Sequence, residues 1–231
     1  ADRRPLMGGN WKLNPTSRSE ATNLVTELGK KIVGISGVDV VVFPPHPFLT
    51  TVYDKIEATQ IKLGGQNCFF EDTGAYTGAV STCMLKDVGV TYVLAGHSER
   101  RTVFKDDDGA IARKTKKILD SGMIPVLCIG ETQEEYDNGL CQEVCTIQLL
   151  KDLAMVPAED MAKVVIAYEP VWAIGTGLVC PADTAQKVHA FIRSVIAKKY
   201  GQAIADRVII QYGGSVKPDN VKEIMSKPDI D

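Results

Sequence analysis

Apolar residues along the 231-residue chain gather in short runs rich in β-branched side chains, and the stretches between these runs have helical patterns. A run that is apolar at every position is typical of a strand buried on both faces of a parallel sheet. Seven runs are predominantly apolar in this way. The predicted strands are Pro5–Gly9, Val38–Phe43, Ile61–Gly65, Thr91–Ala95, Ile124–Ile129, Val164–Tyr168 and Val208–Tyr212.

Helix signals lie between the predicted strands. The segment Ser17–Glu20, SRSE, has the pattern of a capping box that opens a helix. A second helix is expected over Asp108–Ser121, ended by Gly122, and a third from Pro181 to Tyr200. Strand starts that lie roughly 20 to 45 residues apart match the size of a βαβ unit. Because no linker or low-complexity segment interrupts them, residues 1–231 are predicted to form one domain.

The alternation of strands and helices predicts an α/β fold with a parallel sheet, either open and doubly wound or closed into a barrel. The pattern alone does not choose between these two. A glycine-rich GxGxxG segment does not follow the first predicted strand, and the chain has no GxxxxGK[ST]. Their absence from the sequence argues against a nucleotide-binding open sheet.

Composition and charge narrow the class of partner. The chain is 45% hydrophobic, and its 26 basic and 29 acidic residues give a net charge of −3 without a long run of either sign. This balance predicts neither a nucleic-acid-binding nor a membrane-binding surface. An anionic ligand would therefore be held by a local site.

The cysteines are scattered through the chain without a CxxC pair or a histidine at metal-ligand spacing. We expect free thiols in a reducing compartment, the cytoplasm, with the plastid or mitochondrial matrix as alternatives. Cys141 and Cys145 would share a helix face, but two thiols fall short of the four ligands of a structural zinc site. No metal is expected. The six cysteines are Cys68, Cys83, Cys128, Cys141, Cys145 and Cys180.

Polar residues collect directly after the predicted strands. In a barrel all strand carboxyl ends converge on one face, where active sites of that fold are built. Taken singly, each of these residues is typical of a solvated surface or a turn. Together they supply a carboxylate, a neutral donor and a cation, the set that acid–base chemistry needs. The residues are Asn10, Lys12, Gln66, Asn67, His97, Ser98, Glu99, Glu169, Gly213, Gly214 and Ser215.

Four segments carry a resemblance to a known family. They are GGNWKLN (Gly8–Asn14), AGHSERR (Ala95–Arg101), AYEPVWAIGTG (Ala167–Gly177) and YGGSV (Tyr212–Val216). In order and spacing they resemble the signature segments of the triosephosphate isomerase family, and the resemblance covers the whole chain. It implies a (β/α)8 TIM barrel that acts as a homodimer on triose phosphates without a cofactor or a metal.

The resemblance also implies roles for single residues. Glu169 would be the base that moves a proton between neighbouring carbons and so interconverts dihydroxyacetone phosphate and D-glyceraldehyde 3-phosphate through an enediolate. His97 would donate a hydrogen bond as a neutral imidazole. Asn10 and Lys12 would contact substrate oxygens, with Lys12 supplying positive charge for the phosphate and Glu99 orienting Lys12.

A mobile lid is implied next to the base. Its two hinges would be Pro170–Trp172 and Leu178–Cys180, and Tyr212 and Ser215 would hold the lid when it is closed. Gly175 and Ser215 are also expected to bind the phosphate. The residues of the lid tip would be Ala173, Ile174, Gly175, Thr176 and Gly177.

Two further expectations concern assembly and extent. The loop Phe69–Ser81 resembles the family's dimerisation loop, with Tyr76 and Thr77 at the interface. The sequence stops at Asp231, before the place where the family has its eighth βα unit, so we expect that unit to be absent here through a clipped sequence. The alternatives are a catalytically silent or truncated sugar-phosphate-binding barrel, or another phosphate-binding barrel such as an aldolase or epimerase.

Overall fold

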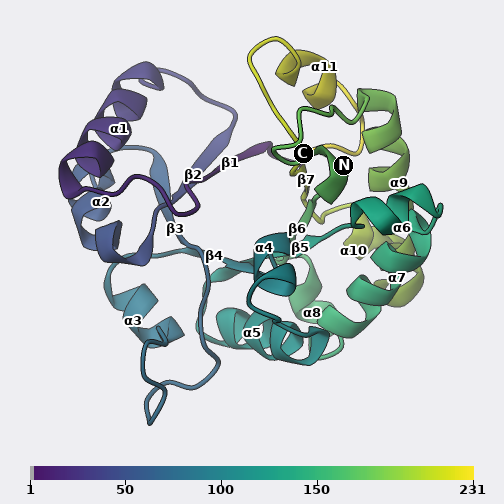
Figure 1. Cartoon of the computed structure of the whole chain (residues 1–231), viewed down its shortest axis with the longest axis horizontal. Coiled ribbons are helices and arrows are strands. Elements are labelled where there is room, and N and C mark those ends of the chain that lie inside the picture. Colours follow the sequence, from purple (N-terminus) through teal and green to yellow (C-terminus); the bar gives the residue numbers. More distant parts are fainter. Residues whose placement is uncertain (1–2) are drawn as a thin grey trace. The chain divides into compact units, whose positions relative to one another are not determined.

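The computed structural model describes residues 3–231 (Figure 1). By their internal contacts these residues form two compact units, each described here by itself. The N-terminal unit comprises Arg4–Ala95 and Lys117–Pro125. The C-terminal unit comprises Arg3, Gly96–Lys116 and Val126–Asp231.

The N-terminal unit contains a four-stranded parallel sheet in which each strand pairs with the next along the chain. Its register places Gly8 opposite Val41 and Val41 opposite Lys62. Figure 1 shows α1 and α2 lying together beside β1, β2 and β3. The elements are β1 (Leu6–Asn10), α1 (Arg18–Lys31), β2 (Asp39–Phe43), the 3-10 helix η1 (His46–Phe48), α2 (Leu49–Ile56), β3 (Ile61–Gly65), α3 (Thr82–Asp87) and β4 (Tyr92–Ala95).

The C-terminal unit has its own parallel ladder, in which β6 pairs with both β5 and β7. The buried side chains Leu127 and Ile166 on this ladder are part of its core, together with Leu149 and Ile192 on the helices. The elements are α4 (Ser98–Thr102), α5 (Asp108–Asp120), β5 (Ile124–Ile129), α6 (Gln133–Asp137), α7 (Cys141–Asp152), α8 (Ala158–Met161), β6 (Val165–Tyr168), η2 (Val171–Ala173), α9 (Ala182–Tyr200), α10 (Gln202–Ala205), β7 (Ile210–Tyr212) and α11 (Val221–Met225). Helix α5 and strand β5 continue from one unit into the other.

All seven predicted strands form, and the two longer predicted helices begin and end within a residue of their expected bounds. The largest shift is at β7, which begins at Ile210 rather than Val208. The reason is local, because the carbonyl of Val208 accepts a hydrogen bond from Arg193 Nη1 at 2.7 Å.

The predicted capping box at Ser17 forms only in part. Ser17 Oγ caps α1 by accepting from the backbone N–H of Glu20 at 3.2 Å. The Glu20 carboxylate accepts from the Ser17 hydroxyl at 2.9 Å instead of from the Ser17 backbone N–H. A complete capping box occurs at α6, where Thr132 and Glu135 cap each other reciprocally.

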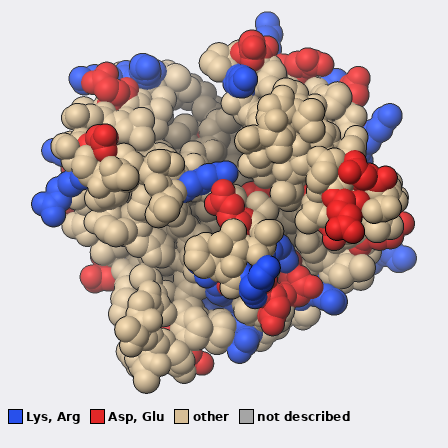
Figure 2. All heavy atoms as spheres, in the orientation of Figure 1, with Lys and Arg blue, Asp and Glu red and all other residues tan. Residues whose placement is uncertain are grey.

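Charge is distributed in small mixed groups on the face shown in Figure 2, with lysines and arginines interspersed among acidic side chains. An acidic group lies over α6, whose residues include Glu134, Glu135 and Asp137. Within residues 3–231, none of the helices has the length and apolar character that crossing a bilayer requires.

A buried polar network anchors α9 to the last residues of the chain. Arg193 Nε donates to Asp229 Oδ1 at 2.7 Å, and its Nη2 donates to Asp231 Oδ2 at 3.0 Å. Asp231 Oδ2 also accepts from the backbone N–H of Ile210, so the network reaches β7. His189 lies four residues before Arg193, and its Nδ1 is 3.1 Å from the carbonyl oxygen of Asp229.

His189 should make the protein sensitive to acid. Burial lowers its pKa from 6.5 to about 4, because the imidazolium would lose its hydration. Between these values the unfolded chain binds a proton that the folded chain does not, so the free energy of unfolding falls as pH falls from 6.5 to 4. The shift corresponds to about 3 kcal/mol.

The variant His189→Gln removes this titration. We expect its free energy of unfolding, measured in urea at pH 7 and pH 4.5, to fall less over this interval than that of the wild type. Other groups titrate equally in both proteins and cancel in the comparison. Equal losses in both proteins would contradict the assignment.

Candidate active site

Glu169 is a buried carboxylate directly after β6, with 6% of its surface exposed. One oxygen, Oε2, accepts a hydrogen bond from the backbone N–H of Ser98 at 3.0 Å. The other, Oε1, lies 2.8 Å from His97 Nε2. The strand therefore ends in a carboxylate that is buried and held in place by these contacts, rather than in a solvated charge.

The hydrogen bonds of His97 specify its tautomer. Its Nδ1 accepts from the backbone N–H of Glu99 at 3.2 Å, at the start of α4. A nitrogen that accepts carries no proton, so the neutral ring has its hydrogen on Nε2, which faces Glu169 Oε1. His97 is 7% exposed. Two segments distant in the sequence thus place a neutral imidazole donor against a carboxylate.

The backbone of Glu169 is held against the end of β5. Its N–H donates to the carbonyl of Ile129 at 2.7 Å, and its own carbonyl lies close to Gly130. Gly130 has φ 155°, and a Cβ built on it would lie 1.8 Å from the Glu169 carbonyl oxygen. Only glycine permits this close approach, which sets the position of the base.

Glu131 is a second buried carboxylate, 1% exposed, and it holds the segment that follows Glu169. Its Oε1 accepts from Trp172 Nε1 at 3.0 Å and from the hydroxyl of Tyr168 at 2.9 Å. Its backbone carbonyl accepts from the N–H of Val171 at 3.1 Å. Burial raises the pKa of Tyr168, and the Glu131 carboxylate raises it further, so this phenol stays a donor.

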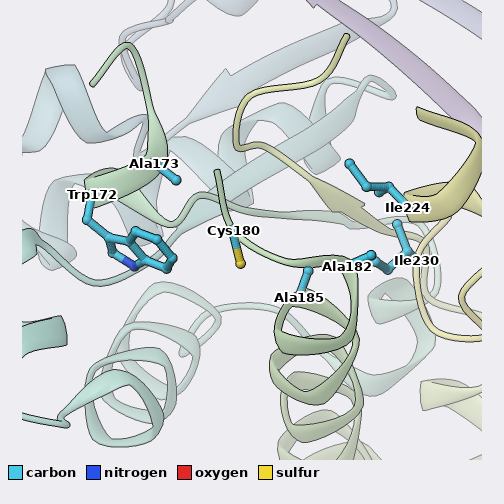
Figure 3. Close-up of a cluster of buried hydrophobic side chains, with 7 residues drawn as sticks. All are labelled: Trp172, Ala173, Cys180, Ala182, Ala185, Ile224 and Ile230. Carbon is cyan, nitrogen blue, oxygen red and sulfur yellow. The ribbon is translucent and has the colours of Figure 1, made fainter. Parts of the chain in front are cut away.

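The predicted lid has buried ends and an exposed middle. Both ends lie in one apolar cluster, drawn in Figure 3, which also receives residues from α9 and α11. Ala173, expected at the tip, lies in this cluster, whereas residues 175–179 are exposed. The cluster consists of Trp172, Ala173, Cys180, Ala182, Ala185, Ile224 and Ile230.

Within the lid, polar contacts order the turn. Thr176 Oγ1 donates to the carbonyl of Trp172 at 2.7 Å and accepts from the N–H of Leu178 at 3.2 Å. Gly175 and Gly177 have positive φ, 65° and 82°, in the left-handed region that glycine adopts without strain. Ile174 follows η2 and is half-buried.

Two residues, one at the end of β7 and one just after it, contact the lid ends. Ser215 Oγ donates to the carbonyl of Ala173 at 2.9 Å. Tyr212 packs against the apolar cluster, and burial raises its pKa with a further contribution from Cys180. The two residues predicted to hold the lid therefore both lie beside its buried ends. Pro170 precedes η2 and accepts from the N–H of Ala173 at 2.8 Å.

Asn10 and Lys12 lie in the N-terminal unit, at and just after the end of β1. Lys12 has φ 55°, which a residue with a side chain adopts at a cost of about 1 to 3 kcal/mol. Asn10 Oδ1 accepts from the Lys12 N–H at 2.9 Å, and Gln66 Nε2 donates to the Lys12 carbonyl at 2.8 Å. Both groups of the Lys12 backbone are thereby held in this conformation.

The predicted dimer loop also belongs to the N-terminal unit. Its aromatic rings pack on one another, with the centroid of Phe69 4.6 Å from that of Tyr76. Tyr76 is nevertheless 46% exposed, and Thr77 beside it is exposed as well. The N–H of Phe69 donates to the carbonyl of Val80 at 2.8 Å and closes the loop.

Sequence reasoning missed Gly130 and Glu131, although the signal that identified the other residues applies to them. They follow directly after β5, as Glu169 follows β6, but the polar residues after that strand were left out of the candidate set. Arg101 was also missed as a positioning residue. It donates to the carbonyls of Gly96 and Cys128 at 2.7 and 2.9 Å and so ties the start of α4 to β5.

The thiols behave as expected for free cysteines. None of the six, each within the described part of the chain, forms a disulfide. Cys68 and Cys180 are buried, and Cys128 is buried with its pKa raised well above the usual value by burial and by the Glu169 carboxylate. Cys128 is therefore a packing residue and not a nucleophile.

Parallel β/α units that place a buried carboxylate and a neutral imidazole just beyond their strand ends define a β/α enzyme equipped for proton transfer. Comparison with known proteins makes this specific. The family model described as triosephosphate isomerase matches residues 5–231. The chain belongs to the triosephosphate isomerase family, and its fold class is the (β/α)8 TIM barrel.

Curated relatives match over nearly the whole chain. The triosephosphate isomerase of Carboxydothermus hydrogenoformans is 51% identical over 229 residues, covering 99% of this chain and 91% of the relative. Those of Alkaliphilus oremlandii and Herpetosiphon aurantiacus are each 48% identical. They cover 99% of this chain, and 92% and 91% of the two relatives.

The variant Gly130→Ala tests whether the close approach at Gly130 positions Glu169. A Cβ cannot lie 1.8 Å from the Glu169 carbonyl oxygen, so the chain must shift or unfold. We expect the free energy of unfolding in urea to fall by at least about 3 kcal/mol, the sum of strain and overpacking.

Gly139→Ala is the matched control. Gly139 also has a positive φ, 70°, but open space surrounds its Cβ position. Its loss should be about 1 kcal/mol, from strain alone. Equal losses in the two variants would show that the close contact with Glu169 contributes nothing to the change in the free energy of unfolding.

Proposed function

We propose that this chain catalyses the isomerisation of dihydroxyacetone phosphate and D-glyceraldehyde 3-phosphate by proton transfer through an enediolate. The observation that carries the proposal is the buried pair formed by Glu169 and the neutral His97, at 2.8 Å, in a chain of this family. Aldose–ketose isomerisation needs a base that takes a proton from one carbon and returns it to the next. It also needs a donor for the oxygen that becomes negative.

Glu169 is the base in this mechanism. The carboxylate takes a proton from the carbon beside the substrate carbonyl, which leaves an enediolate and a neutral carboxylic acid. It then returns the proton to the neighbouring carbon. Its present bonds to Ser98 N–H and His97 Nε2 must be exchanged for substrate before the first step.

His97 stabilises the charge that develops on the substrate oxygens. A donor that is already fixed by its Nδ1 bond to Glu99 needs no reorganisation when the enediolate forms. A neutral imidazole donates a hydrogen bond from its Nε2–H and carries no charge of its own that would have to be taken out of water. In this proposal Glu169 moves the proton, and His97 stabilises the charge that develops on the oxygens.

The remaining assignments follow the family resemblance and are part of the proposal. Asn10 and Lys12 bind substrate oxygens, with Lys12 providing positive charge for the phosphate, and Glu99 orients Lys12. Gly175 and Ser215 bind the phosphate, and the lid excludes water from the enediolate, which could otherwise lose its phosphate. The strained backbone of Lys12 supports a functional role for that residue.

Glu169→Asp tests the role of the base. Shortening the side chain withdraws the carboxylate from the reacting carbon, and a misplacement of about 1 Å costs on the order of 100-fold in rate. We expect kcat for triose-phosphate isomerisation to fall by about this factor while KM changes little, because the loss is confined to the transition state.

Glu159→Asp, at an exposed glutamate in α8, is the matched control and should retain wild-type rates. A loss shared equally between kcat and KM in Glu169→Asp would contradict the role of base. An inactive wild-type chain would favour the alternative of a silent sugar-phosphate-binding barrel.

The proposal includes assembly, domain organisation and location. The two units form one barrel domain, and two copies of the chain form a homodimer through Tyr76 and Thr77. Exposed apolar side chains in the N-terminal unit support an interface. The side chain of Leu13 is 89% exposed and that of Tyr76 is 46% exposed. The free cysteines suit the cytoplasm, or a plastid or mitochondrial matrix.

Tyr76→Asp tests the dimer. A carboxylate at a desolvated interface position loses its hydration, so the dimer dissociation constant should rise at least about tenfold. Sedimentation velocity across a dilution series measures it. Val33→Asp places the same charge at an apolar residue that is exposed after α1, and it should leave the dimer intact. A wild-type chain that sediments as a monomer would refute the proposal.

A further inference from the structure

Glu131 has a second oxygen whose surroundings the isomerase mechanism does not explain. Oε1 accepts from Tyr168 and Trp172, but Oε2 is buried and has no hydrogen-bond donor among the described residues. A buried carboxylate oxygen normally has a partner, because leaving it without one costs about 1 to 3 kcal/mol or more. The side chain is 1% exposed.

Two thiols lie beside this carboxylate. Cys141 is the first residue of α7, and Cys145 follows one turn later on the same face. One sulfur from each cysteine and one Glu131 oxygen all lie within 4.8 Å of one another. Cys145 is fully buried, whereas Cys141 is partly exposed and gives the group access to solvent.

We propose that Glu131, Cys141 and Cys145 form a binding site for a thiophilic divalent cation such as Zn²⁺. Two thiolates and a carboxylate are ligand types that Zn²⁺ accepts, and a water from the Cys141 side completes four-coordination. The pair of cysteines alone predicted no metal site, because the third ligand comes from a separate segment of the chain.

The geometry requires a small contraction. Ligands bound about 2.0 to 2.3 Å from a tetrahedral Zn²⁺ lie roughly 3.3 to 3.8 Å apart. Rotation of the partly exposed Cys141 side chain brings its sulfur towards the other two ligands.

Binding releases protons in a balanced exchange. The Cys145 pKa is raised well above the usual value by the adjacent Cys141, by burial and by the carboxylates of Glu131 and Glu135, so its thiol is protonated without the cation. Two thiols and one divalent cation give a dithiolate complex and two protons, which pass to solvent. No oxidation is involved.

The site also contacts the lid. The carboxylate that would bind the cation accepts from Trp172 Nε1, and Trp172 stacks on Tyr136 with ring centroids 4.1 Å apart. When the cation binds Oε2, Oε1 still accepts the hydrogen bond from Trp172 Nε1. Glu131 can therefore hold the cation and Trp172 at the same time. The carboxylate thus connects the cation to the lid's first hinge.

Cadmium is the probe for this site, because thiolates bound to Cd²⁺ give an ultraviolet charge-transfer band. The whole chain is titrated with Cd²⁺ in a phosphine reductant, which keeps thiols reduced without being a thiol. We expect one Cd²⁺ per chain with the band intensity of two thiolates. Competition by Zn²⁺ should remove the band.

Three variants locate the cation. Cys141→Ser should halve the band and weaken binding at least about tenfold, since even the loss of an indirect partner costs 10 to 100-fold. Cys145→Ala should do the same, and Glu131→Gln should weaken binding while keeping both thiolates. Cys141 is partly exposed and its replacement by serine is conservative. The Cys141→Ser variant therefore tests the site even if Cys145→Ala does not fold.

Cys83→Ser is the matched control, because Cys83 also lies beside a carboxylate, with its sulfur 3.1 Å from Asp72 Oδ1, but offers one exposed thiol. It should bind Cd²⁺ like the wild type. The proposal is overturned if the wild type shows no two-thiolate band at one equivalent. It is also overturned if Cys141→Ser leaves the band unchanged or if Cys83→Ser abolishes it.

Discussion

A buried carboxylate must be given hydrogen-bond donors, and much of the C-terminal unit is organised around two of them. Glu169 receives its donors from the start of α4, and Glu131 receives its donors from β6 and η2. Each donor is a group that must be placed to within a few tenths of an ångström. The two carboxylates therefore restrain the relative positions of α4, β6 and η2 in that unit.

The same constraint shapes the lid. Trp172 contributes its ring to the apolar cluster and its N–H to Glu131, so the first hinge is fixed by packing and by a hydrogen bond together (Figure 3). Of the second hinge, only Cys180 lies in the same cluster. Residues 175–179 between them are exposed. The exposed stretch is tied to the first hinge by the hydrogen bond from Thr176 Oγ1 to the Trp172 carbonyl.

In the N-terminal unit the group that needs hydrogen-bond partners is a strained backbone segment and not a buried charge. Lys12 occupies the left-handed region, and its conformation is maintained by the side chains of Asn10 and Gln66. Strain of this kind persists only where the surroundings hold it. The asparagine that the family resemblance assigns to the substrate thus has a second, structural contact. Gln66 supports the same conformation by donating a hydrogen bond to the backbone carbonyl of Lys12.

The sequence by itself determined the strands and the longer helices and proposed the residues of the candidate site, because predominantly apolar runs and motifs such as AGHSERR are local signals. Only the tertiary structure decided which partners the polar groups have. The tautomer of His97 depends on a backbone N–H at Glu99, and the space for Glu169 depends on Gly130. The contact between Gly130 and Glu169 joins segments distant in sequence, and no local pattern encodes it. The same reason hid the third ligand beside Cys141 and Cys145.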